Sequence, residues 1–131
     1  MNHGTKFWPT VLLGLPILHL ALAFGCGKSL PVASDREKTD AREALVTALD
    51  AWKAGKAAGL KSRTPPVKFM DDDAVQGHAL VSYELDPAVA IEPHRDVQVE
   101  LVIRDRTGKQ QRRRATYQVV LKPNPSVVRN D

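Results

Sequence analysis

Apolar residues are spaced in three different ways along the chain, and each spacing predicts a different kind of segment. Between residues 7 and 25 no charged residue occurs, so this stretch forms an apolar leader. Further along, a small or apolar residue recurs every three or four positions: Ala41, Leu45, Ala48, Trp52 and Gly55. From residue 67 onward, apolar and polar residues alternate. Helical spacing followed by strand spacing predicts an α+β domain after the leader.

The predicted helix has recognisable ends. Glu37 follows Ser34 by three residues, which is the pattern of a capping box. Gly55 is expected just past the end of the helix, because glycine tolerates the left-handed backbone found there, and Pro65-Pro66 prevents further helix. Trp52 is the largest side chain on the apolar stripe. We interpret it as a core residue, and the alternative is a ligand-stacking surface.

The alternating part of the chain predicts four antiparallel strands. They are expected near residues 67–69, 76–85, 97–103 and 115–121, with Val127 and Val128 as a short extension of the last. The helix packs on their shared apolar face. The expected fold is therefore α+β, with one N-terminal helix on a four-stranded antiparallel sheet.

The turn between the last two long strands predicts their register. A three-residue hairpin loop favours glycine at its last position, and Gly108 fits if the loop is residues 106–108. This loop aligns the apolar faces of the two strands and sets one acid opposite one base. The expected pairs are Asp105 with Lys109, Glu100 with Arg114, and Val97 with Tyr117.

The leader ends in a segment, Leu22–Cys26, that resembles the lipobox of bacterial lipoproteins. The small residue Gly25 precedes Cys26, the one cysteine of the chain, and Lys6 is the one cation before the apolar run. The resemblance implies cleavage after Gly25 and attachment of lipid to Cys26, which gives stable membrane anchoring. The expected organisation is a signal peptide over 1–25, a lipidated cysteine with a flexible tether over 26–34, and a domain over 35–131.

The lipobox resemblance also implies a location in the cell envelope, on the extracytoplasmic or periplasmic side of a membrane. An aspartate after the cysteine can favour the inner membrane in such lipoproteins. Gly27 stands there instead, which favours the outer membrane. Two alternatives stay open: the leader is an uncleaved transmembrane anchor, or it is an ordinary secretory signal followed by an unmodified cysteine.

The domain itself resembles small bacterial lipoproteins with a shortened cystatin-like or nuclear-transport-factor-two-like fold. The segments that carry the resemblance are 49–56 (LDAWKAGK), 60–62, 65–67, 77–83 and 116–119. Proteins of this broad fold include isomerases, dehydratases, polyketide cyclases, protease inhibitors and assembly modules, so the fold alone selects no activity. The Gln-x-Val-x-Gly motif of cystatins is absent, because residues 75–77 read Val-Gln-Gly.

Few residues suggest chemistry. Asp71-Asp72-Asp73 has the ligand type that calcium prefers, but it lacks the spacing and glycine of a calcium loop, so we expect a solvated loop. His78 and His94 are candidate acids or bases near neutral pH, and a dyad with Asp73 or Glu92 stays open. A Gly-x-Ser-x-Gly nucleophile motif is absent. The sequence predicts no catalytic residue, no cofactor and no metal site.

The net charge of +4 is modest. The densest basic cluster comprises Arg104, Arg106, Lys109 and Arg112–Arg114. It could contact lipid head groups or an acidic polymer, but we interpret it as solvated strand charge with Glu100 and Asp105 as nearby partners. Nucleic acid is not an expected partner of an exported protein.

These observations favour a membrane-anchored extracytoplasmic module that binds or supports another envelope protein without being an enzyme. It would touch the membrane through the lipid on Cys26 and the partner through the open face or edge of the sheet. The alternative is a small cone-type enzyme with a pocket between the helix and the sheet. That enzyme requires Tyr83, His78 and an acid to converge on one cavity.

Overall fold

A computed structural model describes residues 31–131 of the chain. The predictions for the leader and for Cys26 lie outside these residues. The described elements, in chain order, are α1 (Asp35–Lys53), the 3-10 helix η1 (Ala57–Ser62), β1 (Lys68–Met70), α2 (Asp72–Val75), β2 (Ala79–Glu84), β3 (Asp96–Arg104), β4 (Gln110–Val120) and β5 (Ser126–Arg129). Within this part of the chain, none of the helices is long and apolar enough to cross a membrane.

The ends of helix α1 are as predicted. The Ser34 side chain accepts a hydrogen bond from the backbone N–H of Glu37, and the Glu37 carboxylate accepts one from the backbone N–H of Ser34 at 2.8 Å. Gly55 follows the helix with a φ of +71°, which glycine adopts without strain. The helical stripe is buried, and Trp52 is 5% exposed, which confirms its interpretation as a core residue.

The sheet differs from the prediction. It has five strands in the order β1-β5-β4-β3-β2 and is mixed, because β1 pairs with β5 in parallel while the other neighbours are antiparallel. The segment predicted as an extension of β4 is the separate strand β5, whose Val127 is fully buried. The strand near residues 67–69 was predicted and is β1, but β5 was missed as a separate strand because its four residues are too few to show a distinct alternation.

The register of β3 and β4 is confirmed. Glu100 lies opposite Arg114, and Val97 lies opposite Tyr117. The turn is closed by a hydrogen bond from the Asp105 backbone N–H to the Lys109 carbonyl at 2.9 Å. Gly108 has a φ of +88°, as the last position of this hairpin loop requires.

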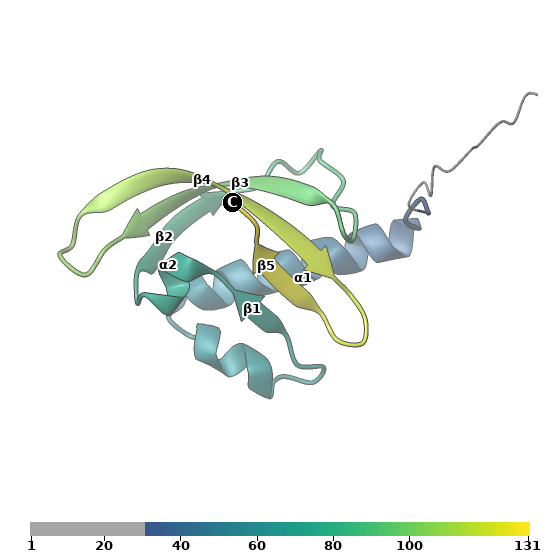
Figure 1. Ribbon diagram of the computed structural model, residues 1–131, viewed down its shortest axis with the longest axis horizontal. Coiled ribbons are helices and arrows are strands. Elements are labelled where there is room, and N and C mark those ends of the chain that lie inside the picture. Colours follow the sequence, from purple (N-terminus) through teal and green to yellow (C-terminus); the bar gives the residue numbers. More distant parts are fainter. Residues whose placement is uncertain (1–30) are drawn as a thin grey trace, which may run out of the picture. The chain divides into compact units, whose positions relative to one another are not determined.

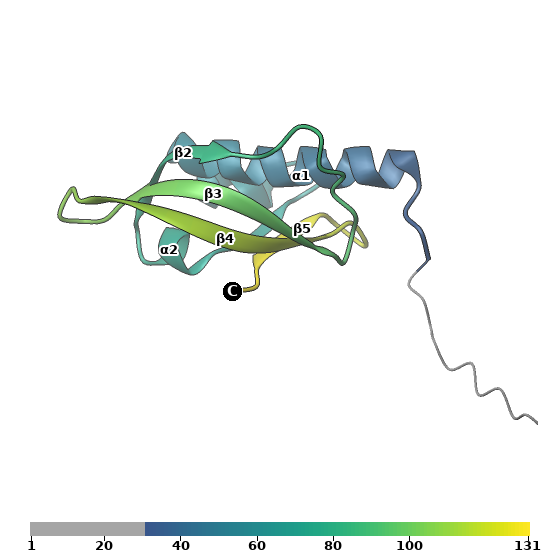
Figure 2. The same cartoon turned by 90° about the horizontal axis from the view of Figure 1, so that it is seen from above.

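The sheet curls around α1. Figure 1 shows β2, β3 and β4 arching over α1 while β5 and β1 continue the curl, and Figure 2 shows α1 running along one face of the sheet. The core fills the space between them. It contains the alternating residues Val97, Val99, Leu101 and Ile103 of β3 and Ala115, Tyr117 and Val119 of β4.

A short crossover segment, residues 71–78, connects the two edges of the sheet. It is needed because β1 and β2 are consecutive in sequence but lie at opposite edges. The segment passes over the face that carries α1, since Asp71 contacts Tyr117, which shares that face with the buried residues Ala115 and Val119. Its contacts form the most polar part of the interior.

Candidate functional site

The crossover segment carries a buried cluster of charged side chains. Asp71 and Asp73 are 2% and 3% exposed, so the prediction of a solvated aspartate loop was wrong for both residues. Asp72 between them is exposed. The reason is helix α2, whose N-terminus is capped by the Asp71 side chain accepting from the Ala74 N–H at 3.0 Å. One helical turn directs Asp71 and Asp73 inward and Asp72 outward.

The Asp71 carboxylate accepts a hydrogen bond from the middle strand of the sheet. The Tyr117 hydroxyl donates to its Oδ2 at 2.6 Å, and Arg129 of β5 lies 3.6 Å from the same oxygen. Burial and the neighbouring Asp71 carboxylate both raise the pKa of Tyr117, so its hydroxyl stays protonated and remains a donor. The bond joins the crossover segment to the central strand of the sheet.

Asp73 is the centre of the cluster. Its Oδ1 lies 2.9 Å from Nδ1 of His78 and 3.2 Å from an Arg113 nitrogen, and Arg129 donates to its Oδ2. Burial tends to raise the pKa of Asp73, but hydrogen bonds from Arg129 and His78, with the charge of Arg113, outweigh burial and hold the pKa below its ordinary value. Two strands, β4 and β5, and the crossover segment therefore meet at one carboxylate.

The His78–Asp73 dyad left open by the sequence is present, but its geometry favours a structural role. Both oxygens of Asp73 are occupied by arginine, so the carboxylate is shared rather than reserved for the imidazole. The His78 carbonyl accepts from the Trp52 indole N–H at 2.9 Å. His94 is not part of the cluster. It is exposed in the loop before β3, and its backbone N–H donates to the Val119 carbonyl.

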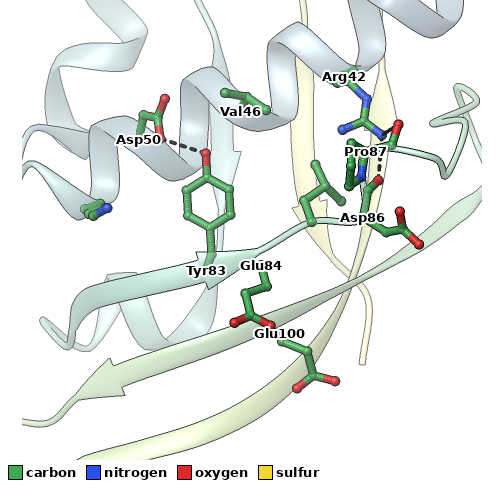
Figure 3. A pocket seen from close by; sticks show the side chains of 10 residues that line it. Arg42, Val46, Asp50, Tyr83, Glu84, Asp86, Pro87 and Glu100 are labelled. Carbon is green, nitrogen blue, oxygen red and sulfur yellow. Dashed lines mark hydrogen bonds between the residues drawn. The ribbon is translucent and has the colours of Figure 1, made fainter.

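An open groove of about 780 Å³ lies between α1 and the edge strand β2 (Figure 3). Its lining comprises Arg42, Val46, Asp50 and Lys53 of α1, and Tyr83, Glu84, Leu85, Asp86, Pro87 and Glu100. The Tyr83 hydroxyl donates to Asp50 at 2.7 Å across the groove. Partial burial and then Asp50 raise the pKa of Tyr83 to about 12, so this bond persists at neutral pH.

The wall of the groove opposite α1 is an unpaired sheet edge. β2 ends the strand order, so its outer backbone N–H and C=O groups have no strand partner in residues 31–131. Such an edge accepts an additional extended segment. The groove lining has four acids and two bases. Glu84 lies opposite Glu100, which Arg114 neutralises at 2.6 Å.

The basic residues of β4 have different environments. Arg114 pairs with Glu100, as the sequence predicted, and Arg113 pairs with Asp73, a partner that was not predicted. Arg112 is exposed and forms no ion pair with residues 31–131. In the same part of the chain, no three His, Cys, Asp or Glu side chains are arranged to hold a metal ion.

The fold and site define a small α+β domain with one main helix on a curled mixed sheet, a charge cluster under its crossover segment, and an open groove at one edge. Comparisons of the chain with protein-family models, with curated proteins and with solved structures found no match. The resemblance to cystatin-like lipoproteins therefore stays a prediction.

Proposed function

We propose that this chain is a lipid-anchored extracytoplasmic protein whose domain is a non-enzymatic binding module. The anchor hypothesis rests on the uncharged leader and on Gly25-Cys26 at its end. The described helix begins at Asp35, which leaves the eight residues 27–34 as tether. A chain of that length reaches at most about 30 Å, so the domain would stay close to the membrane surface.

The observation that carries the module hypothesis is that the polar residues are already bonded to partners within the domain. Those best suited to chemistry are engaged within the cluster: Asp73 bonds to His78 and Arg113, and Tyr117 donates to Asp71. Tyr83 lines the groove, whereas His78 does not. A cone-type enzyme needs Tyr83, His78 and an acid on one cavity, and this separation favours binding over catalysis.

The groove beside β2 is the surface proposed for a protein partner. An extended segment of an envelope protein would add to the free edge of β2, gaining main-chain hydrogen bonds, while α1 contacts its side chains. Because four of the six charged lining residues are acidic, the segment is expected to carry Lys or Arg. Val46, Leu85 and Pro87 supply the apolar contacts.

The anchor is tested by replacing Cys26 with serine. We expect Cys26→Ser to abolish acylation and to move the protein from the detergent-rich to the aqueous phase in detergent phase separation, because the acyl chains supply the membrane affinity. Mass spectrometry of the N-terminal peptide gives the second readout. A matched control adds Ser29→Cys to Cys26→Ser, which restores a thiol outside the lipobox and should restore no lipid. Unchanged membrane association with an intact leader would contradict the anchor.

The binding surface is tested by site-specific photocrosslinking in cells. A photoreactive amino acid at Glu84, in the groove, is expected to form one discrete adduct with a partner protein. The control places it at Val75, which is 80% exposed on the crossover segment and does not line the groove. Adducts of equal yield at both positions, or none at Glu84, would contradict docking on β2.

A further inference from the structure

The β3–β4 hairpin carries a concentrated positive charge. Residues 104–114, which we call the basic hairpin, contain six Arg or Lys and one Asp, while residues 31–103 and 115–131 together contain eleven Arg or Lys and fourteen Asp or Glu. All residues of the basic hairpin except Asp105 are exposed. The domain is therefore strongly polarised, with one positive end and a negative remainder.

Most of this charge is not neutralised within the domain. Of the six cations, Arg113 and Arg114 have acidic partners. The other four form no ion pair with residues 31–131: Arg104, Arg106, Lys109 and Arg112. The carboxylate of the single acid, Asp105, stabilises the turn. It accepts hydrogen bonds from the backbone N–H groups of Thr107 at 2.9 Å and Lys109 at 3.0 Å. Four positive side chains are left for an external anion.

The cations occupy both faces of a narrow ribbon. Arg112 and Arg104 alternate with the buried residues of their strands and so face away from α1. Arg113 faces the other way, toward Asp73, and the Arg106 guanidinium lies beside Gly77 of the crossover segment. Figures 1 and 2 both show the hairpin projecting at the end of the domain remote from the first turn of α1. A ligand that bends around the ribbon can reach more of these cations than a flat surface can.

We propose that the basic hairpin is a binding site for a flexible anionic polysaccharide bearing carboxylate groups. Guanidinium groups bind carboxylates with two parallel hydrogen bonds. The hairpin contains no aromatic residue on which nucleic-acid bases could stack. It also contains no apolar side chain that would insert into a bilayer. The choice of a polysaccharide rests on the proposed extracytoplasmic location, where such polymers occur.

The test measures binding of the full-length protein in neutral detergent to fluorescently labelled alginate, a linear polyuronate, with dextran as the uncharged polymer. We expect binding to alginate alone, weakening steeply as salt is raised. The test variant combines Arg104→Gln, Arg106→Gln, Lys109→Gln and Arg112→Gln. Since these four side chains are the unneutralised cations, Kd should rise at least about tenfold.

A control variant with the same loss of charge separates a local site from general attraction. It combines Lys61→Gln, Arg63→Gln, Lys68→Gln and Lys122→Gln, which are exposed, unpaired within the described chain and outside the hairpin. We expect this variant to bind alginate nearly as well as the unmodified protein, and both variants to keep its melting temperature.

The proposal is overturned if alginate does not bind, if the two variants lose affinity equally, or if anionic lipid vesicles or single-stranded DNA bind more tightly than alginate. None of these outcomes depends on lipid at Cys26. Failure of the polysaccharide site is therefore distinguishable from failure of the anchor, which the phase-separation experiment measures.

Discussion

Replacing Asp73 with alanine is expected to lower the free energy of unfolding by about 3 kcal/mol, the effect of removing one partner from a buried ion pair. Asp73 is 3% exposed and accepts from Arg129, Arg113 and His78. Its loss leaves Arg129, whose side chain is 12% exposed, with a weaker set of partners. The total free energy of unfolding of a domain of this size is about 5–15 kcal/mol, so urea unfolding should reveal the change readily.

The neighbouring aspartate provides the matched control. Asp72→Ala removes the same charge from the same helix, but Asp72 is exposed, so its loss should change stability by less than about 0.5 kcal/mol. Arg113→Gln should fall between the two, because the Arg113 side chain is 42% exposed and water replaces part of its interaction. Equal effects of Asp72→Ala and Asp73→Ala would contradict the cluster.

The same residue predicts how stability depends on pH. The pKa of Asp73 in the folded protein lies below its ordinary value of 3.8, so at acidic pH the unfolded chain takes up the proton first. The contribution of Asp73 to the free energy of unfolding is complete above its ordinary pKa, and it is lost as the pH falls through the lowered pKa of the folded protein. Below about pH 4, the free energy of unfolding of Asp73→Asn should therefore fall less steeply with decreasing pH than that of the unmodified protein. Identical acid profiles would exclude this role.

The elements that could be predicted from sequence are those with long periodic patterns or local turn chemistry. Helix α1 follows from its stripe and capping box, and the β3–β4 register follows from Gly108. The parallel pairing of β1 with β5 could not be predicted, because it brings together two short segments that are far apart in the chain, and no local pattern encodes such a contact. Short strands gain their stability from neighbours, not from their own sequence.

The positions of two arginines in the sequence indicate the charge cluster. Arg113 is four residues before the buried Tyr117, and Arg129 is two residues after the buried Val127, so both arginines belong to the apolar faces of their strands. A cation on a core face requires an acid beneath it. Asp71 and Asp73 were the natural candidates, but the three aspartates were interpreted as a solvated loop and not as an N-capped helical turn.

Trp52→Ala is expected to have the largest effect on stability, about 4 kcal/mol, which is typical when a buried tryptophan is truncated. Trp52 packs on Phe69 of β1 with ring centroids 5.9 Å apart, and its indole N–H donates to the His78 carbonyl at 2.9 Å. Trp52 therefore contacts β1, just before the crossover segment, and His78, the last residue of that segment. Trp52→Phe should lose roughly 1–2 kcal/mol, because it keeps most of the apolar area and loses the hydrogen bond, and Lys53→Ala, on the exposed next residue, should be nearly neutral.

Combining Trp52→Ala with Asp73→Ala tests whether the two residues stabilise the same segment. Trp52 contacts the crossover segment from α1, and Asp73 joins it to β4 and β5. Once one contact is lost, the segment is already loosened, so the second substitution should cost less than it does alone, with a coupling energy of about 1 kcal/mol from urea unfolding of the four proteins. Strictly additive losses would mean that the helix and the charge cluster hold the crossover independently, and that the segment does not behave as one unit.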